Sequence, residues 1–125
     1  MKRIVIVDDQ PAFCFLWKDF FERKYGSKAA VEIYTDPLRA LRFIDESISL
    51  LMLDLEMPLM DGKKLLKHAV ARGVNPLRIV IVSGRDADDL HRLFPQGSCL
   101  AVVNKKESQQ QKAFRMIVDS IMKKE

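Results

Sequence analysis

The sequence predicts a doubly wound α/β domain, in which helices cover both faces of a parallel sheet. Three observations lead to this prediction. Four short runs are apolar at every position, as is typical of strands buried on both faces: residues 4–7, 50–53, 79–82 and 100–103. Helical patterns separate these runs. Strand and helix alternate five times within 125 residues, a length that fits one domain.

The first run is followed by a helical pattern of apolar side chains. They recur three and four positions apart, which places them on one helix face: Phe13, Leu16, Trp17, Phe20 and Phe21. We expect this stripe to pack against the sheet rather than bind a cofactor. The next strand, residues 31–34, alternates apolar and polar side chains. One of its faces is therefore less buried, which suits the edge of the sheet.

The second and third helices have clear boundary signals. Asp36 and Pro37 predict an N-cap and a first-turn proline. The inner face of that helix would be Leu38, Leu41 and Ile44. After the strand at 50–53, a third helix would place four apolar side chains on one face, before a stop at residues 73–76: Leu65, Leu66, Ala69 and Val70.

The last two helices follow the strands at 79–82 and 100–103. Asp86 predicts the cap of a short helix with Leu90, Leu93 and Phe94 on its inner face. Ser108 and Gln111 predict a capping box for the final helix. The inner face of that helix would be Phe114, Ile117, Val118 and Ile121.

Composition narrows the class of protein. The chain is 48% hydrophobic and 30% charged, which indicates a globular domain rather than a disordered chain. Its apolar runs are far shorter than the ~20 residues of a membrane helix. Cys14 and Cys99 are too few for a disulfide framework, and the N-terminus lacks a signal-peptide pattern. We therefore expect a cytoplasmic protein with reduced thiols.

The net charge of +4 comes from 21 Lys and Arg against 17 Asp and Glu. It indicates either an acidic partner such as nucleic acid or a basic solvated surface. No helix-turn-helix pattern is present, which disfavours nucleic acid. The same two interpretations apply locally to Lys63, Lys64 and Lys67, near the start of the third predicted helix.

Chemistry-bearing side chains follow four of the five predicted strands. They are Asp8, Asp9, Asp54, Ser83 and Lys105. In a doubly wound sheet, ligands bind outside the carboxyl ends of the strands. We therefore expect three carboxylates, a hydroxyl and an ammonium group to converge at one rim.

This set of groups suits phosphoryl chemistry. Clustered carboxylates without His or Cys favour a hard cation such as Mg²⁺. Mg²⁺ beside a lysine and a hydroxyl can handle a phosphoryl group, and an Asp carboxylate can be its nucleophile. The sequence contains neither G-x-x-x-x-G-K-[ST] nor G-x-G-x-x-G. We therefore expect the chain to accept a phosphoryl group from another molecule rather than hold a nucleotide.

Residues 54–62, D-L-E-M-P-L-M-D-G, resemble the D-x-x-M-P-x-M-D-G segment of response regulator receiver domains. These domains are the phospho-acceptor half of two-component signalling. The Asp8–Asp9 pair, Ser83 and Lys105 match the family too, and the resemblance covers the whole chain. It implies a flavodoxin-like (βα)5 sandwich with strand order 2-1-3-4-5. It also implies a single receiver domain over residues 1–125, without an output domain.

The resemblance implies a role for each acidic residue. Asp54 would be the phosphorylated nucleophile and a metal ligand. Asp9 would bind Mg²⁺ directly, and Asp8 mainly through a metal-bound water. The backbone carbonyl of Glu56 would be a further protein ligand, with Mn²⁺ as an alternative metal. The domain would catalyse its own phosphorylation and dephosphorylation.

Ser83 and Lys105 would each contact a phosphoryl oxygen. Lys105 is preferred to Lys106 because it follows Val102-Val103-Asn104, 22 residues after Ser83. The family often has proline where Lys106 stands and an aromatic residue where Val102 stands. The aromatic half of the family's conformational switch is therefore absent.

Glu56 and Arg85 each lie two residues beyond a predicted site residue, so both should border the pocket. They would form a salt bridge at the rim, or tune how readily water attacks an acyl phosphate.

The resemblance implies a stand-alone receiver. It would accept a phosphoryl group from a sensor histidine kinase or a histidine phosphotransfer domain. A downstream protein would bind through the face of the fourth helix, fifth strand and fifth helix. One alternative is an interaction module that works without phosphorylation of Asp54. Another is a flavodoxin-type cofactor binder, which the acidic rim disfavours.

Overall fold

The computed structural model describes residues 1–106 and 108–123, apart from the side chains of residues 87 and 108–110. Five parallel strands form one sheet in the order β2-β1-β3-β4-β5. They are β1 (Lys2–Val7), β2 (Ala29–Tyr34), β3 (Leu50–Asp54), β4 (Ile79–Ser83) and β5 (Ala101–Asn104). The predicted sheet and strand order are confirmed.

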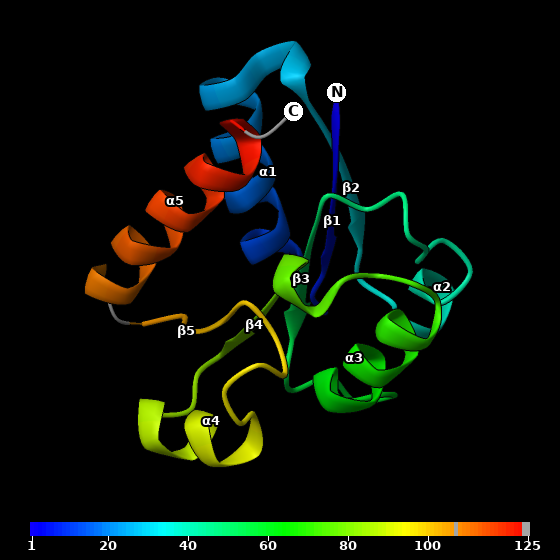
Figure 1. Ribbon diagram of the computed structural model, residues 1–125, viewed down its shortest axis with the longest axis vertical. Coiled ribbons are helices and arrows are strands. Elements are labelled where there is room, and N and C mark those ends of the chain that lie inside the picture. Colours follow the sequence, from blue (N-terminus) through cyan, green and yellow to red (C-terminus); the bar gives the residue numbers. More distant parts are fainter. Residues whose placement is uncertain (107, 124–125) are drawn as a thin grey trace.

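Helices connect the strands and cover both faces of the sheet (Figure 1). They are α1 (Pro11–Tyr25), α2 (Pro37–Ala40), α3 (Gly62–Ala71), α4 (Ala87–Leu93) and α5 (Ser108–Lys123). Short 3-10 helices η1 (Gly26–Lys28) and η2 (Pro76–Arg78) precede β2 and β4. Among the described residues, no helix is both long and apolar enough to span a membrane.

Two apolar clusters fill the space between the sheet and its helices. Alternate side chains of a strand point to opposite faces. Accordingly, Ile4 and Ile6 pack with α1 and α5, whereas Val5 and Val7 pack with α2, α3 and α4. Every residue of β3 and β4 is buried, as their unbroken apolar sequences predict. The covered centre of the sheet supplies rigid strand ends for a site.

The two edge strands behave alike. β2 is half-buried along its whole length, which confirms its predicted place at the edge. The run at 100–103 was expected to be covered on both faces. Leu100, Ala101 and Val102 are instead only half-buried. The reason is topological, because β5 pairs with β4 alone and forms the opposite edge.

The inner face of α1 differs from the predicted stripe. Trp17 and Phe21 are buried as expected, but Leu16 is 62% exposed and Cys14 takes an inner position. The Trp17 ring packs edge-on against Phe114 of α5, with ring centroids 4.9 Å apart. A small thiol at Cys14 fits close to the sheet. Leu38 and Val70, also expected to face inward, are similarly exposed at the rims of their helices.

The second helix is shorter than the sequence predicts, because it ends at Ala40. Arg3 of β1 binds the segment that follows the helix. Its Nη2 donates to the carbonyl oxygen of Phe43 at 2.5 Å, and its Nη1 to Asp45 Oδ1 at 3.1 Å. The carbonyl of Phe43 is thus bound by the guanidinium. Ile44 remains buried in the core as predicted.

Two of the three predicted helix caps are present. Asp36 Oδ1 accepts from Leu38 N at 2.9 Å, and Asp86 Oδ1 accepts from Asp89 N at 3.0 Å. The side chain of Ser108 lies outside the described residues. Its expected capping-box partner, Gln111, donates from Nε2 to the carbonyl of Lys105 at 2.6 Å.

Candidate functional site

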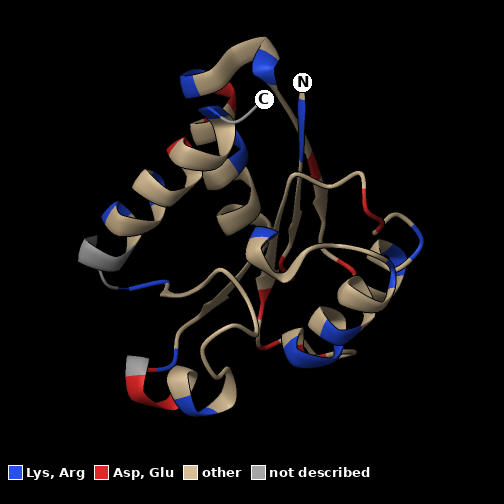
Figure 2. Ribbon diagram, in the orientation of Figure 1, with Lys and Arg blue, Asp and Glu red and all other residues tan. Residues whose placement is uncertain are grey.

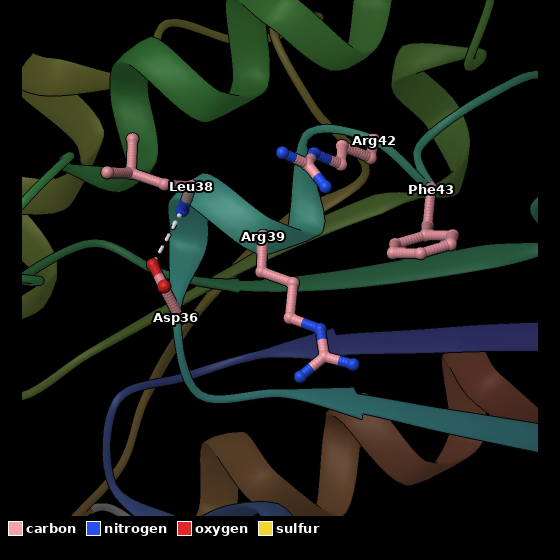
Figure 3. Close-up of a pocket in the computed structure, with 5 residues that line it drawn as sticks. All are labelled: Asp36, Leu38, Arg39, Arg42 and Phe43. Atoms are coloured by element: carbon pink, nitrogen blue, oxygen red, sulfur yellow. Dashed lines mark hydrogen bonds between the residues drawn. The ribbon is translucent and has the colours of Figure 1, made fainter.

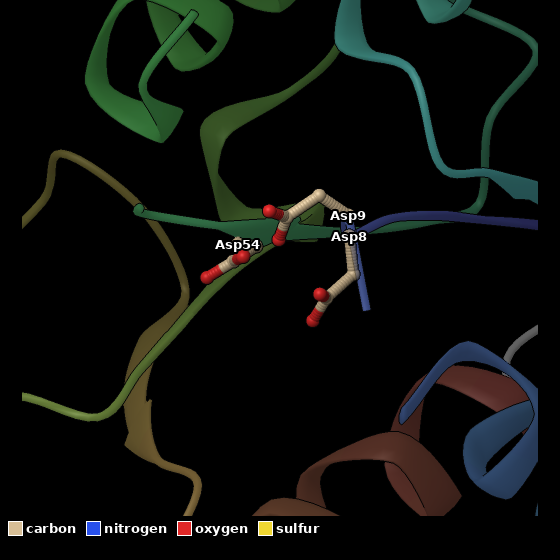
Figure 4. Close-up of side chains that lie close together, drawn as sticks. All are labelled: Asp8, Asp9 and Asp54. Atoms are coloured by element: carbon tan, nitrogen blue, oxygen red, sulfur yellow. The ribbon is translucent and has the colours of Figure 1, made fainter. Parts of the chain in front are cut away.

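Three carboxylates meet at the carboxyl ends of β1 and β3. Oxygen atoms of Asp8, Asp9 and Asp54, here called the acidic cluster, lie within 4.8 Å of one another (Figure 4). The sheet register explains the meeting. Val7 pairs with Leu53, so the acids that follow lie side by side where the two parallel strands end.

Burial makes the acidic cluster electrostatically costly. Asp8 is 1% exposed and Asp54 is 4% exposed. Loss of solvation, and after it the negative charge of Asp8, raise the pKa of Asp54 to about 7. Lys105 acts in the opposite direction. A second cation at this point would relieve the repulsion between the carboxylates.

Lys105 already supplies one positive charge. Its Nζ lies 2.8 Å from Asp8 Oδ2 and 3.4 Å from Asp54 Oδ1. The amine also donates to Gln10 Oε1 at 3.2 Å and stands 4.5 Å from the centroid of the Phe13 ring. Lys106 is exposed. The structure therefore brings Lys105, rather than Lys106, to the acidic cluster.

Ser83 is fully buried at the end of β4, and its hydroxyl faces Glu56. Ser83 Oγ donates to Glu56 Oε1 at 2.6 Å and accepts from Arg85 N at 3.0 Å. Arg85 Nε lies 3.4 Å from the same Glu56 oxygen, which is the ion pair expected from the sequence. Both side chains of that pair are about half exposed, so it lies at the rim.

The loop after Asp54 is held close to the strand end. Glu56 N donates to Asp54 Oδ1 at 3.3 Å, and Gly62 N donates to Leu55 O at 2.8 Å. A Cβ atom on Gly62 would lie 2.5 Å from the backbone oxygen of Asp54. Only glycine allows α3 to begin this close to the acidic cluster.

Several neighbouring residues were missed by reasoning from the sequence. Gln10 and Phe13 contact the amine of Lys105, as described above. Asn104 Nδ2 donates to Arg85 O at 2.7 Å, and its Oδ1 accepts from Lys106 N at 2.7 Å. Asn104 links the loops that follow β4 and β5. Its place at a strand end was a usable signal, whereas the contacts of Gln10 and Phe13 depend on the packing of α1.

A surface hollow adjoins the acidic cluster at Asp9. A hollow of about 600 Å³ is lined by Asp9, Gln10, Phe13 and Leu16, among others. Beside it, Phe15 and Leu16 of α1 are each 62% exposed. The start of α1 therefore offers apolar surface next to a member of the acidic cluster.

A separate hollow of about 450 Å³ lies along α2. It is lined by Asp36, Leu38, Arg39, Arg42 and Phe43 (Figure 3). Asp36 points to the backbone of Leu38 as its cap. The acidic cluster contributes no residue to this hollow.

A doubly wound domain with buried aspartates and a lysine at its strand ends defines a class of small α/β domains that bind ligands at this rim. A family model described as the response regulator receiver domain matches residues 4–118. The chain belongs to the response regulator receiver domain family, which acts in two-component signalling.

A curated relative agrees with the family match. Response regulator GtcR from Aneurinibacillus migulanus is 33% identical over 90 residues, covering 71% of this chain and 36% of that protein. The chain therefore spans little more than a third of the length of this curated relative.

Solved structures share the fold at low sequence identity. A two-component response regulator from Clostridium difficile gives a TM-score of 0.80 at 18% identity, covering 99% of this chain and 98% of that one. A receiver domain protein from Clostridium thermocellum gives 0.78 at 17%, covering 98% and 94%. One from Methanospirillum hungatei JF-1 gives 0.75 at 24%, covering 97% and 94%.

The donor set of the acidic cluster fits Mg²⁺. Three carboxylates can reach a common centre, and the described residues of the cluster include no thiolate or imidazole. Mg²⁺ prefers oxygen ligands and is held by a few carboxylates while keeping several waters. The partly exposed position of Asp9 leaves room for such waters.

Proposed function

We propose that this receiver accepts a phosphoryl group on Asp54 and signals through phosphorylation-dependent protein binding. The observation that carries the proposal is the buried acidic cluster with the amine of Lys105 at 2.8 Å from Asp8 and 3.4 Å from Asp54. In this arrangement the ammonium group of Lys105 offsets part of the negative charge of the carboxylates. The carboxylates also provide ligands for a metal cation. This is the requirement of phosphoryl transfer to a carboxylate.

Asp8, Asp9 and Asp54 would hold Mg²⁺, or Mn²⁺ as an alternative, together with the backbone carbonyl of Glu56. The bound metal would supply positive charge to the equatorial oxygens of the transferring group. The short loop between Asp54 and Gly62 supports this assignment, since it keeps the Glu56 backbone beside the cluster.

Asp54, Lys105 and Ser83 would each have a separate role in the transfer. An oxygen of Asp54 attacks phosphorus as the bond to a donor histidine nitrogen breaks, and that nitrogen afterwards takes a proton from solvent. Lys105 pairs with a phosphoryl oxygen, and Ser83 donates a hydrogen bond to another. Water later cleaves the acyl phosphate. In this limited sense the domain catalyses its own phosphorylation and dephosphorylation.

The donor would be a sensor histidine kinase or a histidine phosphotransfer domain. The exposed Phe15 and Leu16 beside Asp9 support docking of a donor protein at this end of α1. A downstream protein would bind the face of α4, β5 and α5. The open edge of β5 and the 70% exposure of Met116 support a contact there.

We further propose that residues 1–125 act as one receiver unit inside the cytoplasm. The alternative function is an interaction module that binds its partner whether or not Asp54 is phosphorylated. The half-buried Val102, where the family often has an aromatic switch residue, favours this alternative.

Treatment with acetyl phosphate and Mg²⁺, followed by intact-mass measurement, tests the proposal. We expect the wild type to gain one phosphoryl group and Asp54→Asn to gain none. Asp88→Asn, which removes an exposed carboxylate of α4, is the matched control and should be labelled like the wild type. Labelling of Asp54→Asn, or no labelling of the wild type, would contradict the proposal.

Wild type and Asp54→Asn also distinguish a phosphorylation-dependent receiver from an interaction module. Binding to a downstream partner that is equal for wild type and Asp54→Asn, with and without acetyl phosphate, would favour the interaction module.

A further inference from the structure

A second hollow on the surface has no part in the proposed phosphoryl chemistry. It lies between α3 and the end of α4, has a volume of about 550 Å³ and is here called the α3–α4 groove. Its apolar lining includes Leu66 and Val70 from α3, Pro76 from η2, and Leu93, Phe94 and Pro95. Val70 is 41% exposed although it is an aliphatic residue of a helix. The groove is therefore an apolar surface open to solvent.

One wall of the α3–α4 groove is basic. Lys63 and Lys67 line it, and both are exposed. Neither lysine forms an ion pair in the part of the chain that the structure describes, and no Asp or Glu is among the lining residues. Asp61, the nearest acid in sequence, is occupied as the cap of α3 through Lys64 N at 2.9 Å. Figure 2 colours the Lys and Arg positions along the ribbon of α3 blue.

The arrangement selects one kind of occupant. Lys63, Leu66, Lys67 and Val70 are spaced so that each cation alternates with an apolar side chain along one face of α3. A ligand that matches it needs apolar anchors beside carboxylates at the same helical repeat. An acidic amphipathic helix has this pattern. A nucleic acid would satisfy the lysines but leave the exposed Val70 side chain without an apolar contact.

We propose that the α3–α4 groove is a docking site for an acidic amphipathic helix of a partner protein. The site is distinct from the acidic cluster and from the face of α4, β5 and α5, and binding there does not require a phosphoryl group on Asp54. The helix lays its apolar side chains between α3 and the end of α4. Its carboxylates pair with Lys63 and Lys67.

The α3–α4 groove is lined by the helices that follow β3 and β4, the strands that end at Asp54 and Ser83. α3 begins at Gly62, whose backbone is bonded to Leu55 beside Asp54. α4 follows the loop that begins at Ser83 and Arg85. The α3–α4 groove thus bridges the helices that leave β3 and β4, away from the α1 surface next to Asp9.

The test uses labelled synthetic helices of about four turns as the probe. One carries leucines at positions i, i+3/i+4 and i+7, flanked by glutamates. A second has lysines in place of the glutamates, and a third has alanines in place of the leucines. Fluorescence anisotropy with the full chain should show saturable binding of the first probe and at least about tenfold weaker binding of the other two.

Variants locate the binding. Val70→Glu, and separately the double variant Lys63→Glu/Lys67→Glu, should each weaken binding of the first probe by about tenfold or more. All three positions are exposed, so folding should be retained and is checked by thermal unfolding. Met116→Glu and Lys112→Glu on α5 are the matched apolar and charge controls and should bind like the wild type.

Four outcomes would overturn the proposal. They are absence of saturable binding, equal binding of the lysine-flanked probe, equal binding of the alanine probe, and equal loss of binding in the α5 controls. Sedimentation of the chain alone adds a further test. Self-association that Val70→Glu abolishes would show that a second copy of the chain occupies the groove, which also contradicts the proposal.

Discussion

The hydroxyl of Ser83 donates a 2.6 Å hydrogen bond to Oε1 of Glu56, and Arg85 holds the same carboxylate oxygen at 3.4 Å. Ser83 is the residue that we propose to contact the phosphoryl group. Its hydroxyl has one proton to donate. A hydrogen bond to a phosphoryl oxygen therefore requires Ser83 to leave Glu56, so the two acceptors compete.

This competition predicts that Glu56 and Arg85 affect the lifetime of the phosphorylated state. In Glu56→Ala/Arg85→Ala, the hydroxyl of Ser83 is free to turn to the phosphoryl group. The rate of aspartyl-phosphate loss should change about two- to tenfold, which corresponds to about 0.4–1.4 kcal/mol. Decay is measured by intact mass after removal of acetyl phosphate. Glu22→Ala, on the exposed side of α1, is the control. An unchanged decay rate in the double variant would refute this role.

Lys105 and Lys106 should differ sharply in function although they are neighbours. Lys105→Ala removes the amine between Asp8 and Asp54, so labelling by acetyl phosphate should slow by about a hundredfold or more. Lys106→Ala should stay within about twofold of wild type, because Lys106 is exposed. Initial rates of labelling check this. Equal losses in the two variants would contradict the role of Lys105.

The pKa of Asp54 predicts how the stability of the metal-free protein depends on pH. Folding raises this pKa to about 7, so the protonated form is favoured in the folded state. The stabilisation from Asp54 is therefore present in acid and lost as the pH rises through about 7. Asp54→Asn cannot ionise, and it should be more stable than wild type by about 1–3 kcal/mol near pH 8.

Urea unfolding in a chelator across a pH series measures this difference. Titrating groups that do not contact Asp54 are common to both proteins and cancel in the comparison. The advantage of Asp54→Asn should shrink as the pH falls below about 7. A difference that is constant with pH would show that folding does not raise the pKa of Asp54. Added Mg²⁺ should stabilise the wild type more than Asp54→Asn, because the variant has lost one carboxylate ligand.

Gly62 and Gly84 both lie near the acidic cluster, and alanine substitutions at the two positions should differ in their effect on stability. In Gly62→Ala the new Cβ would lie 2.5 Å from Asp54 O, so we expect a loss of about 2–4 kcal/mol in unfolding free energy. In Gly84→Ala the nearest atom is Lys106 Cε at 4.0 Å, and the loss should stay below about 1 kcal/mol. Denaturant unfolding compares them. Similar stabilities of the two variants would mean that α3 can shift away from Asp54 without cost.

The sequence was sufficient to predict the sheet and the meeting of Asp8, Asp9 and Asp54. Unbroken apolar runs are typical of strands covered on both faces, and the carboxyl ends of parallel strands meet at one rim. The motif at residues 54–62 supplied the strand order through the resemblance that it carries. These inferences succeed because they depend on local periodicity and on a topology that few arrangements satisfy.

Other features were decided by contacts between residues far apart in the chain. α2 ends at Ala40 and Arg3 binds the carbonyl of Phe43 beyond it, while the packing of α1 buries Cys14 and exposes Leu16. The tertiary structure also determines that the hydroxyl of Ser83 bonds to Glu56. A residue's type fixes which bonds it can make. The free energy of each alternative depends on burial and on which partners the fold brings within reach, and only the three-dimensional structure supplies these.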